Sequence, residues 1–120
     1  AKNTNGKIFA IDIHKPFLDR LLKTAIDEDV SDRIEVKEMS MLSLEFKENS
    51  FDVIWSEGAI FIIGFEKGIQ EWKKYIKTGG YLVISEISWL RQDIPKEPKN
   101  FWQSDYPEMK GIADNIKIIE

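Results

Sequence analysis

Four short apolar runs alternate with segments of helical periodicity, and this alternation restricts the fold more than any other feature of the chain. The runs are Ile8–Ile13, Arg33–Met39, Phe51–Ser56 and Tyr81–Ser85. Such alternation is typical of parallel strands that are joined by crossover helices. The last two runs are almost continuously apolar, which predicts strands that are covered on both faces. The sequence therefore predicts an α/β fold with a mostly parallel sheet.

Two segments carry the helical signals. Pro16 stands where a first helical turn begins, because its missing N–H costs nothing there, and an apolar stripe follows it. A second helix is expected over Glu66–Lys77, with Gly79-Gly80 providing a left-handed exit. Its expected buried face consists of Ile69, Trp72 and Ile76. Residues 89–120 are punctuated by prolines and predict loop or short helix.

The charge balance and the absence of cysteine exclude several kinds of site. The 17 basic and 21 acidic residues give a net charge of −4 and leave no basic patch for nucleic acid or an anionic membrane. With no cysteine, disulfides and thiolate chemistry are excluded, and no metal site is expected. The chain also has no apolar run of the roughly 18 residues that a membrane helix needs. We therefore expect a cytoplasmic protein that acts on neither nucleic acid nor membrane.

Asp12 is the strongest single candidate for a functional residue. It ends the first apolar run just before a predicted helix, where a carboxylate faces the crevice beyond a parallel sheet. A carboxylate there can accept hydrogen bonds from the two vicinal hydroxyls of a ribose; alternatively, it only supports the start of the helix. The glycine-rich loop that usually accompanies such an acid lies about 20 residues earlier. Only five residues precede Gly6, so we expect a chain that lacks this loop and the strand before it, with both ends cut.

Several motifs in order resemble those of class I S-adenosylmethionine-dependent methyltransferases. The segment from Asp12 to Phe17 is similar to the acid, turn and helix after the second strand of that family. Met39–Phe46 is similar to its GDAxxLPF stretch, Phe51–Ser56 to its FDxVxS strand, and Lys77–Glu86 to its LKPGGxLxxxE strand. The resemblance covers about residues 7–86. It implies a Rossmann-like sheet that is incomplete here because the central first strand is absent.

The resemblance also implies a cofactor, S-adenosylmethionine, and positions for it. Asp12 would hold the ribose hydroxyls, and Ile13 would pack against the adenine. Ser40 and Met41 occupy the positions that meet the adenine amino group and ring. Ser40 departs from the acidic residue that is usual there, so it would form a weaker, neutral hydrogen bond. The implied domain is a single partial one over 1–120, with a strand and helix core at 1–88 and an acceptor-side segment at 89–120.

Other polar and aromatic residues are candidates on the acceptor side. Glu57 follows the third run, where the family brings cofactor and acceptor together, and could act as a general base or remain a solvated carboxylate. Glu86 is a similar but weaker candidate, and His14 is expected at the surface. An aromatic set could line an acceptor pocket or simply pack on the sheet. It comprises Trp89, Phe101, Trp102 and Tyr106.

Three functions remain open from the sequence. The first is methyl transfer to a small molecule, with this chain carrying the ribose and adenine half of the site and inactive alone. The second is a fragment of an NAD(P)-dependent oxidoreductase, which also uses an acid after its second strand. The third is a folded, non-catalytic piece that associates with itself. Because the missing strand would sit between the second and the fourth, we expect either strand rearrangement or a homodimer through exposed strand edges.

Overall fold

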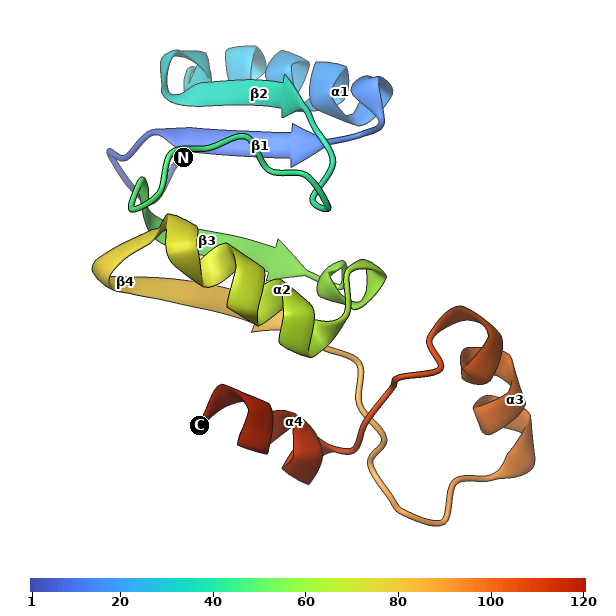
Figure 1. Cartoon of the computed structure of the whole chain (residues 1–120). Coiled ribbons are helices and arrows are strands. Elements are labelled where there is room, and N and C mark those ends of the chain that lie inside the picture. Colours follow the sequence, from blue (N-terminus) through green and yellow to red (C-terminus); the bar gives the residue numbers. More distant parts are fainter. The chain divides into compact units, whose positions relative to one another are not determined.

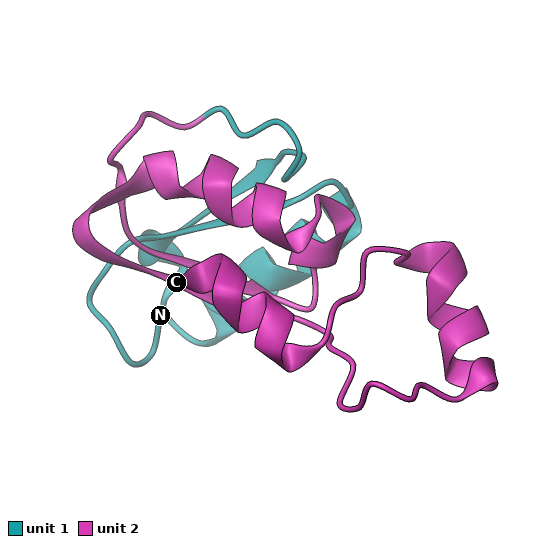
Figure 2. Ribbon diagram, turned by 60° about the horizontal axis from the view of Figure 1, so that its bottom comes forward, with its two compact units in different colours: residues 1–45 teal, residues 46–120 magenta.

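The computed structural model describes residues 1–120, which form two compact units, residues 1–45 and residues 46–120 (Figure 2). Each unit contains one two-stranded parallel sheet whose strands are joined through a helical connection (Figure 1). The parallel pairing and the crossover helices confirm the α/β prediction. The expected strand rearrangement is not seen. β1 pairs only with β2, and β3 pairs only with β4, which are neighbours in the sheet that the resemblance implies.

The first unit is a single strand, helix and strand motif. Strand β1 (Ile8–Asp12) leads into helix α1 (Lys15–Asp27), a 3₁₀ turn η1 (Ser31–Arg33) and strand β2 (Ile34–Glu38). The parallel register pairs each residue from Ile8 to Asp12 with its counterpart from Ile34 to Glu38. Helix α1 contacts both strands and buries Leu18 and Ala25, which confirms part of the predicted apolar stripe. Phe17 and Ile26, at the two ends of that stripe, are exposed.

Both ends of α1 follow from local sequence. Pro16 is the second residue of the helix, where no N–H is required. At the other end, Asp29 adopts a left-handed conformation with φ of 54°. The Val30 N–H then reaches back to the Ala25 carbonyl at 2.9 Å, and the Val30 side chain is buried. This is the hydrogen-bond pattern that closes helices before a reversal of the chain, and it directs the chain back toward β2.

The second unit begins with another parallel pair. Strand β3 (Phe51–Glu57) is followed by a 3₁₀ turn η2 (Ile60–Ile62), helix α2 (Phe65–Trp72), a 3₁₀ turn η3 (Lys73–Tyr75) and strand β4 (Ile76–Ser85). Ile60 is the one side chain that is completely buried. It lies against Gly68 of α2, where an added Cβ would come within 2.6 Å of Ile60 Cγ1. Gly68 therefore allows the turn and the helix to approach closely.

The predicted helix over Glu66–Lys77 is too long at its C-terminal end. Trp72 is buried and Ile69 is half-buried, as expected, but the α-helix ends at Trp72 and Ile76 pairs with Phe51 in the sheet. The reason is the turn before β3, whose Asn49 and Ser50 N–H groups donate to the carbonyls of residues 74 and 75. Gly79, with φ of 81°, does not end a helix but lies in β4, at an irregularity of the β3–β4 register.

The expectation that β3 and β4 are covered on both faces was wrong. Alternate residues along each strand are half-buried, and the intervening ones are exposed. The exposed set comprises Val53, Trp55, Tyr81 and Val83, which we call the open face. Val53 lies opposite Tyr81 and Trp55 opposite Val83, so the four side chains form two cross-strand pairs. An apolar run predicts burial only where an element covers each face, and this unit leaves one face uncovered.

Residues 89–120 contain two short helices and loops, as the sequence predicts. Helix α3 (Lys96–Asp105) and helix α4 (Ile112–Ile119) are joined by a short connection (Figure 1). Trp89 forms a parallel bridge to Gly111, and its N–H donates to the Lys110 carbonyl at 2.9 Å. This bridge ties the segment after β4 to the start of α4. Of the predicted aromatic set only Tyr106 is buried, whereas Phe101 is mostly exposed.

Candidate functional site

Asp12 lies at the carboxyl end of β1, as the sequence predicts. Its Oδ1 accepts a hydrogen bond from the His14 N–H at 2.7 Å, so one carboxylate oxygen does support the start of α1. The second oxygen, Oδ2, carries no hydrogen bond within the chain. The two alternatives for Asp12 are therefore compatible, since one oxygen orders the turn and the other remains available to a ligand hydroxyl.

Ile13 and the segment after β2 lie at the same sheet edge. The Met39 N–H donates to the Asp12 carbonyl at 3.1 Å, which holds the ends of the two strands together. Ile13 is 72% exposed and offers a free apolar side chain. Ser40 begins a turn, and its Oγ accepts a hydrogen bond from the Leu42 N–H at 3.2 Å. A hydroxyl oxygen has two lone pairs, so Ser40 can still meet a second donor.

The structure thus groups four of the five predicted site residues in the first unit. Asp12, Ile13, Ser40 and the half-buried Met41 all follow the carboxyl ends of β1 and β2. Ligands of parallel α/β sheets bind at this edge. The residues fit an adenosine group because they combine a carboxylate oxygen for ribose hydroxyls, an exposed aliphatic side chain for a purine face and a hydroxyl for its polar edge.

Glu57, the predicted catalytic residue, belongs to the second unit. It is the last residue of β3, it is exposed, and its Oε1 accepts a hydrogen bond from Trp55 Nε1 at 2.9 Å. The next residue, Gly58, has φ of 57°, and its N–H donates to Ser85 Oγ at 2.8 Å. The turn after β3 is therefore fixed to the end of β4, which holds Glu57 at the carboxyl end of this sheet.

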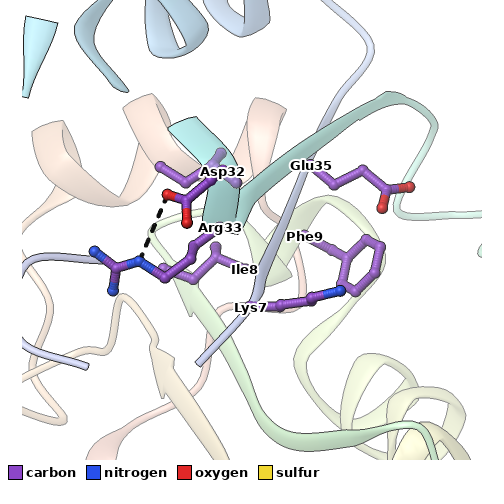
Figure 3. Close-up of a pocket in the computed structure, with 7 residues that line it drawn as sticks. Lys7, Ile8, Phe9, Asp32, Arg33 and Glu35 are labelled. Carbon is purple, nitrogen blue, oxygen red and sulfur yellow. Dashed lines mark ion pairs between the residues drawn. The ribbon is translucent and has the colours of Figure 1, made fainter. Parts of the chain in front are cut away.

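A hollow of about 250 Å³ lies at the opposite edge of the first sheet, and Figure 3 shows the residues around it. It is formed at the amino ends of β1 and β2 by Lys7, Phe9, Arg33 and their neighbours. Arg33 Nε lies 3.8 Å from an oxygen of Asp32, and its NH1 donates to the Ala1 carbonyl at 2.9 Å. Because Arg33 is used to hold the N-terminal segment, we assign this hollow a structural role.

The second unit contains a partly buried polar cluster that the sequence only partly indicated. We define the polar cluster as Glu86, Ser88, Tyr106 and Asn115. Asn115 Nδ2 donates to Ser88 Oγ at 2.8 Å, and Tyr106 and Glu86 lie close enough to influence each other's pKa. Sequence reasoning named Glu86 as a weaker candidate but missed Asn115. Asn115 could have been found from the helical spacing of the isoleucines. It lies three or four residues from Ile112, Ile118 and Ile119, at a position where an apolar residue is expected on the buried side of a helix.

Burial changes the acidity of both titratable groups in the polar cluster. Desolvation raises the pKa of the Glu86 carboxyl above its usual range, and the hydrogen bond from Tyr106 and the charge of Lys110 oppose that shift. Desolvation and the neighbouring Glu86 raise the pKa of the Tyr106 phenol. The phenol of Tyr106 therefore keeps its proton.

No group of three or more histidine or acidic side chains is arranged to hold a metal ion. None of the helices has the length and apolar character needed to cross a bilayer.

Comparison with solved structures defines the class of fold. The geranyl diphosphate C-methyltransferase of Streptomyces coelicolor A3(2), in complex with Mg²⁺, geranyl diphosphate and S-adenosyl-L-homocysteine, matches with a TM-score of 0.80 and 12% identity over 98% of this chain and 44% of that one. A putative sarcosine dimethylglycine methyltransferase from Galdieria sulphuraria matches with a TM-score of 0.75 and 22% identity over 93% and 43% of the two chains. The fold is therefore the Rossmann-like fold of S-adenosylmethionine-dependent methyltransferases.

The sequence comparisons identify the family. The family model described as a methyltransferase domain matches residues 1–84, so the chain belongs to the methyltransferase domain family of the class I, S-adenosylmethionine-dependent type. The 2-methyl-6-phytyl-1,4-hydroquinone methyltransferase of Synechocystis sp. is 32% identical over 74 residues, which are 61% of this chain and 22% of that protein. The chain spans about a fifth of this curated relative and about half of the similar structures.

Proposed function

We propose that this chain takes part in methyl transfer from S-adenosylmethionine to a small-molecule acceptor and carries the adenosine side of the cofactor site. The observation that carries the proposal is the free Oδ2 of Asp12 beside Ser40 and Met41, at the carboxyl edge of the β1–β2 pair. Asp12 would bind the ribose hydroxyls, Ile13 would pack on the adenine, and Ser40 and Met41 would contact its amino group and ring.

The cofactor, when bound, supplies an electrophilic methyl group on a sulfonium. Transfer of this methyl group to a nucleophilic atom of the acceptor would break the carbon–sulfur bond and leave the electron pair on sulfur as a thioether. We propose that Glu57, held by Trp55 at the carboxyl end of β3, receives the proton that the acceptor loses. Positioning of the reacting groups would account for most of the rate. We also propose that the single partial domain has two parts: residues 1–88 form the strand and helix core, and residues 89–120 contribute to binding of the methyl acceptor.

Two observations favour a small molecule as the acceptor. The net charge of −4 gives no electrostatic footprint for nucleic acid. The names of similar proteins also favour a small-molecule acceptor. The curated relative is named for a hydroquinone, and one of the similar structures contains geranyl diphosphate. A nicotinamide-dependent function has no corresponding support, because the family match over residues 1–84 is to a methyltransferase domain.

Ligand-induced stabilisation tests the proposed cofactor. S-adenosylhomocysteine at about ten times its dissociation constant is expected to add about 1.4 kcal/mol to the free energy of unfolding, because it binds only the folded chain. NAD at the same concentration is expected to add nothing and serves as the control. The measurement is a denaturant or thermal unfolding curve at several ligand concentrations. Stabilisation by NAD alone would refute the proposal.

Self-association is a further expectation from the exposed strands. Each two-stranded sheet leaves one backbone edge of each strand unpaired, and the open face adds Trp55 and Tyr81, which are 67% and 69% exposed. We propose that a second copy of the chain covers these surfaces. Light scattering is expected to show a dimer whose population rises with concentration and falls in Tyr81→Lys. Thr78→Lys, at an exposed position of the same strand, should leave the dimer unchanged; a monomer at every concentration would contradict the proposal.

A further inference from the structure

The segment from Trp89 to Gly111 follows β4 and leads to α4 as a loop whose two ends are joined. The parallel bridge between Trp89 and Gly111 closes it, and the Trp89 N–H donates to the Lys110 carbonyl at 2.9 Å. Helix α3 lies within this loop (Figure 1). A hollow of about 240 Å³ is lined entirely by residues between positions 89 and 109. One continuous segment therefore supplies the whole lining.

Most of this lining is apolar. It includes Trp89, Ile94 and Met109, and all three side chains are half-buried. Small-molecule sites typically combine such an apolar wall with a few placed polar groups. In this hollow the hydrophilic side chains are those of Lys99 and Gln103.

Helix α3 places these two side chains on one wall of the hollow. Lys99 and Gln103 lie four positions apart, so they occupy the same side of the helix. Tyr106 also lines the hollow and follows Lys99 by seven positions, at the C-terminal end of α3. A helix rises roughly 10 Å over seven residues. The wall therefore has an ammonium at one end, an amide between, and a phenol at the other end.

Lys99 is the only charged residue in the lining. Its ammonium forms no ion pair or hydrogen bond within the chain, whereas Arg91 and Asp93, earlier in the same loop, pair with each other. The acidic residues of α3, Glu97 and Asp105, do not line the hollow. The hollow therefore carries one positive charge that no carboxylate of the chain neutralises.

The opposite end of the hollow has the opposite electrostatic character. The negative charges of Glu86 and Glu108 act on the Tyr106 phenol. An anion at this end would meet like charges, whereas an anion at Lys99 would meet an unpaired ammonium. The charges thus favour an elongated ligand with its anionic group at Lys99 and a neutral body toward Tyr106.

We propose that the hollow binds a compact apolar molecule that bears a carboxylate, with the carboxylate at Lys99 and Gln103 and the apolar body against Trp89, Ile94 and Met109. Lys99 would donate a charge-assisted hydrogen bond, and the Gln103 amide would donate a second one. The designation of this molecule as the methyl acceptor rests on the proposed function. The binding chemistry stands on the hollow and its unpaired cation alone.

Benzoate, benzamide and benzylamine are suitable probes, because they present similar rings with a negative, a neutral and a positive group. By NMR titration of the full chain, benzoate is expected to bind at least tenfold more tightly than benzamide or benzylamine. It should also shift the side-chain amide resonances of Gln103 and the indole N–H resonance of Trp89. Absence of benzoate binding, or equally tight binding of benzamide or benzylamine, would overturn the proposal.

Lys99→Met keeps most of the length of the side chain and removes its charge. It is expected to weaken benzoate binding about tenfold and to leave benzamide binding unchanged. Lys96→Met is the matched control, since Lys96 is an exposed residue of α3 outside the lining. Unchanged benzoate affinity in folded Lys99→Met, or an equal loss in Lys96→Met, would contradict the role of Lys99. If Lys99→Met does not fold, the Gln103 resonances of the unmodified chain decide the question.

Stabilisation by S-adenosylhomocysteine, measured on the same samples, separates the two proposals. Stabilisation without benzoate binding would overturn the carboxylate site and leave the proposed function in place. Benzoate binding without such stabilisation would support the carboxylate site and remove its designation as the site of the methyl acceptor.

Discussion

Replacement of Asp12 by alanine is expected to weaken the binding of S-adenosylhomocysteine about thirtyfold, which corresponds to about 2 kcal/mol. The variant removes the carboxylate oxygen that is free at the carboxyl end of β1, and with it a charge-assisted hydrogen bond to a ribose hydroxyl. Isothermal titration calorimetry on both proteins measures the difference directly.

Alanine at this position also removes the acceptor of the His14 N–H, so a second variant is needed. Asp12→Asn can keep that hydrogen bond through its amide oxygen but loses the charge, and we expect it to weaken binding about tenfold without changing the unfolding midpoint. Asp19→Asn, which loses only the exposed pair with Lys15, should bind normally. Full affinity in Asp12→Asn and Asp12→Ala alike would remove Asp12 from the cofactor site.

Replacement of Ile60 by alanine is expected to lower the free energy of unfolding by about 3 kcal/mol. Ile60 is completely buried, so truncation loses the transfer free energy of three carbons and leaves a cavity between η2 and α2. Ile60→Val removes one carbon and should cost about 1 kcal/mol. Urea denaturation, followed by circular dichroism, measures both changes as shifts of the midpoint at constant slope.

The contact between Ile60 and Gly68 provides an internal control. Gly68→Ala alone should destabilise by about 2 kcal/mol, because the new Cβ would lie within 3.0 Å of Ile60 Cγ1 and Cδ1 and of Ile63 Cγ2. In the double variant the two Ile60 atoms are gone, and the alanine methyl fills part of the cavity. We therefore expect the double variant to be more stable than the sum of the single effects requires. Simple additivity would show that these residues do not share a packing site.

The sequence predicted the elements of the fold better than their boundaries. Alternating apolar runs and helical stripes located all four strands and both crossover helices, because each pattern reflects burial on one or two faces. The end of α2 could not be predicted, since helical spacing places Ile76 on the same stripe as Trp72. Pairing of the turn before β3 with the backbone of residues 74 and 75 draws Ile76 into the sheet. That interaction connects residues about 25 positions apart and leaves no local signal.

The sequence predicted those residues of the candidate site that lie at the carboxyl ends of strands. Asp12, Ile13, Ser40 and Met41 share a sheet edge because parallel pairing brings the ends of β1 and β2 together. The polar cluster was harder to predict from the sequence. Ser88 and Asn115 lie 27 positions apart, so their hydrogen bond has no local signal in the sequence. Only the presence of asparagine among the isoleucines of α4 indicated that a polar contact would be found there.

The pairing of β1 with β2 and of β3 with β4 also has a kinetic consequence. In each pair, the residues that meet are separated by only 25–28 positions, with a helix in the intervening loop. Neither ladder needs a residue of the other pair to close its loop, so each can form by itself. We expect each ladder to appear as its own step in refolding, so that amide protection would develop in two separate groups of residues.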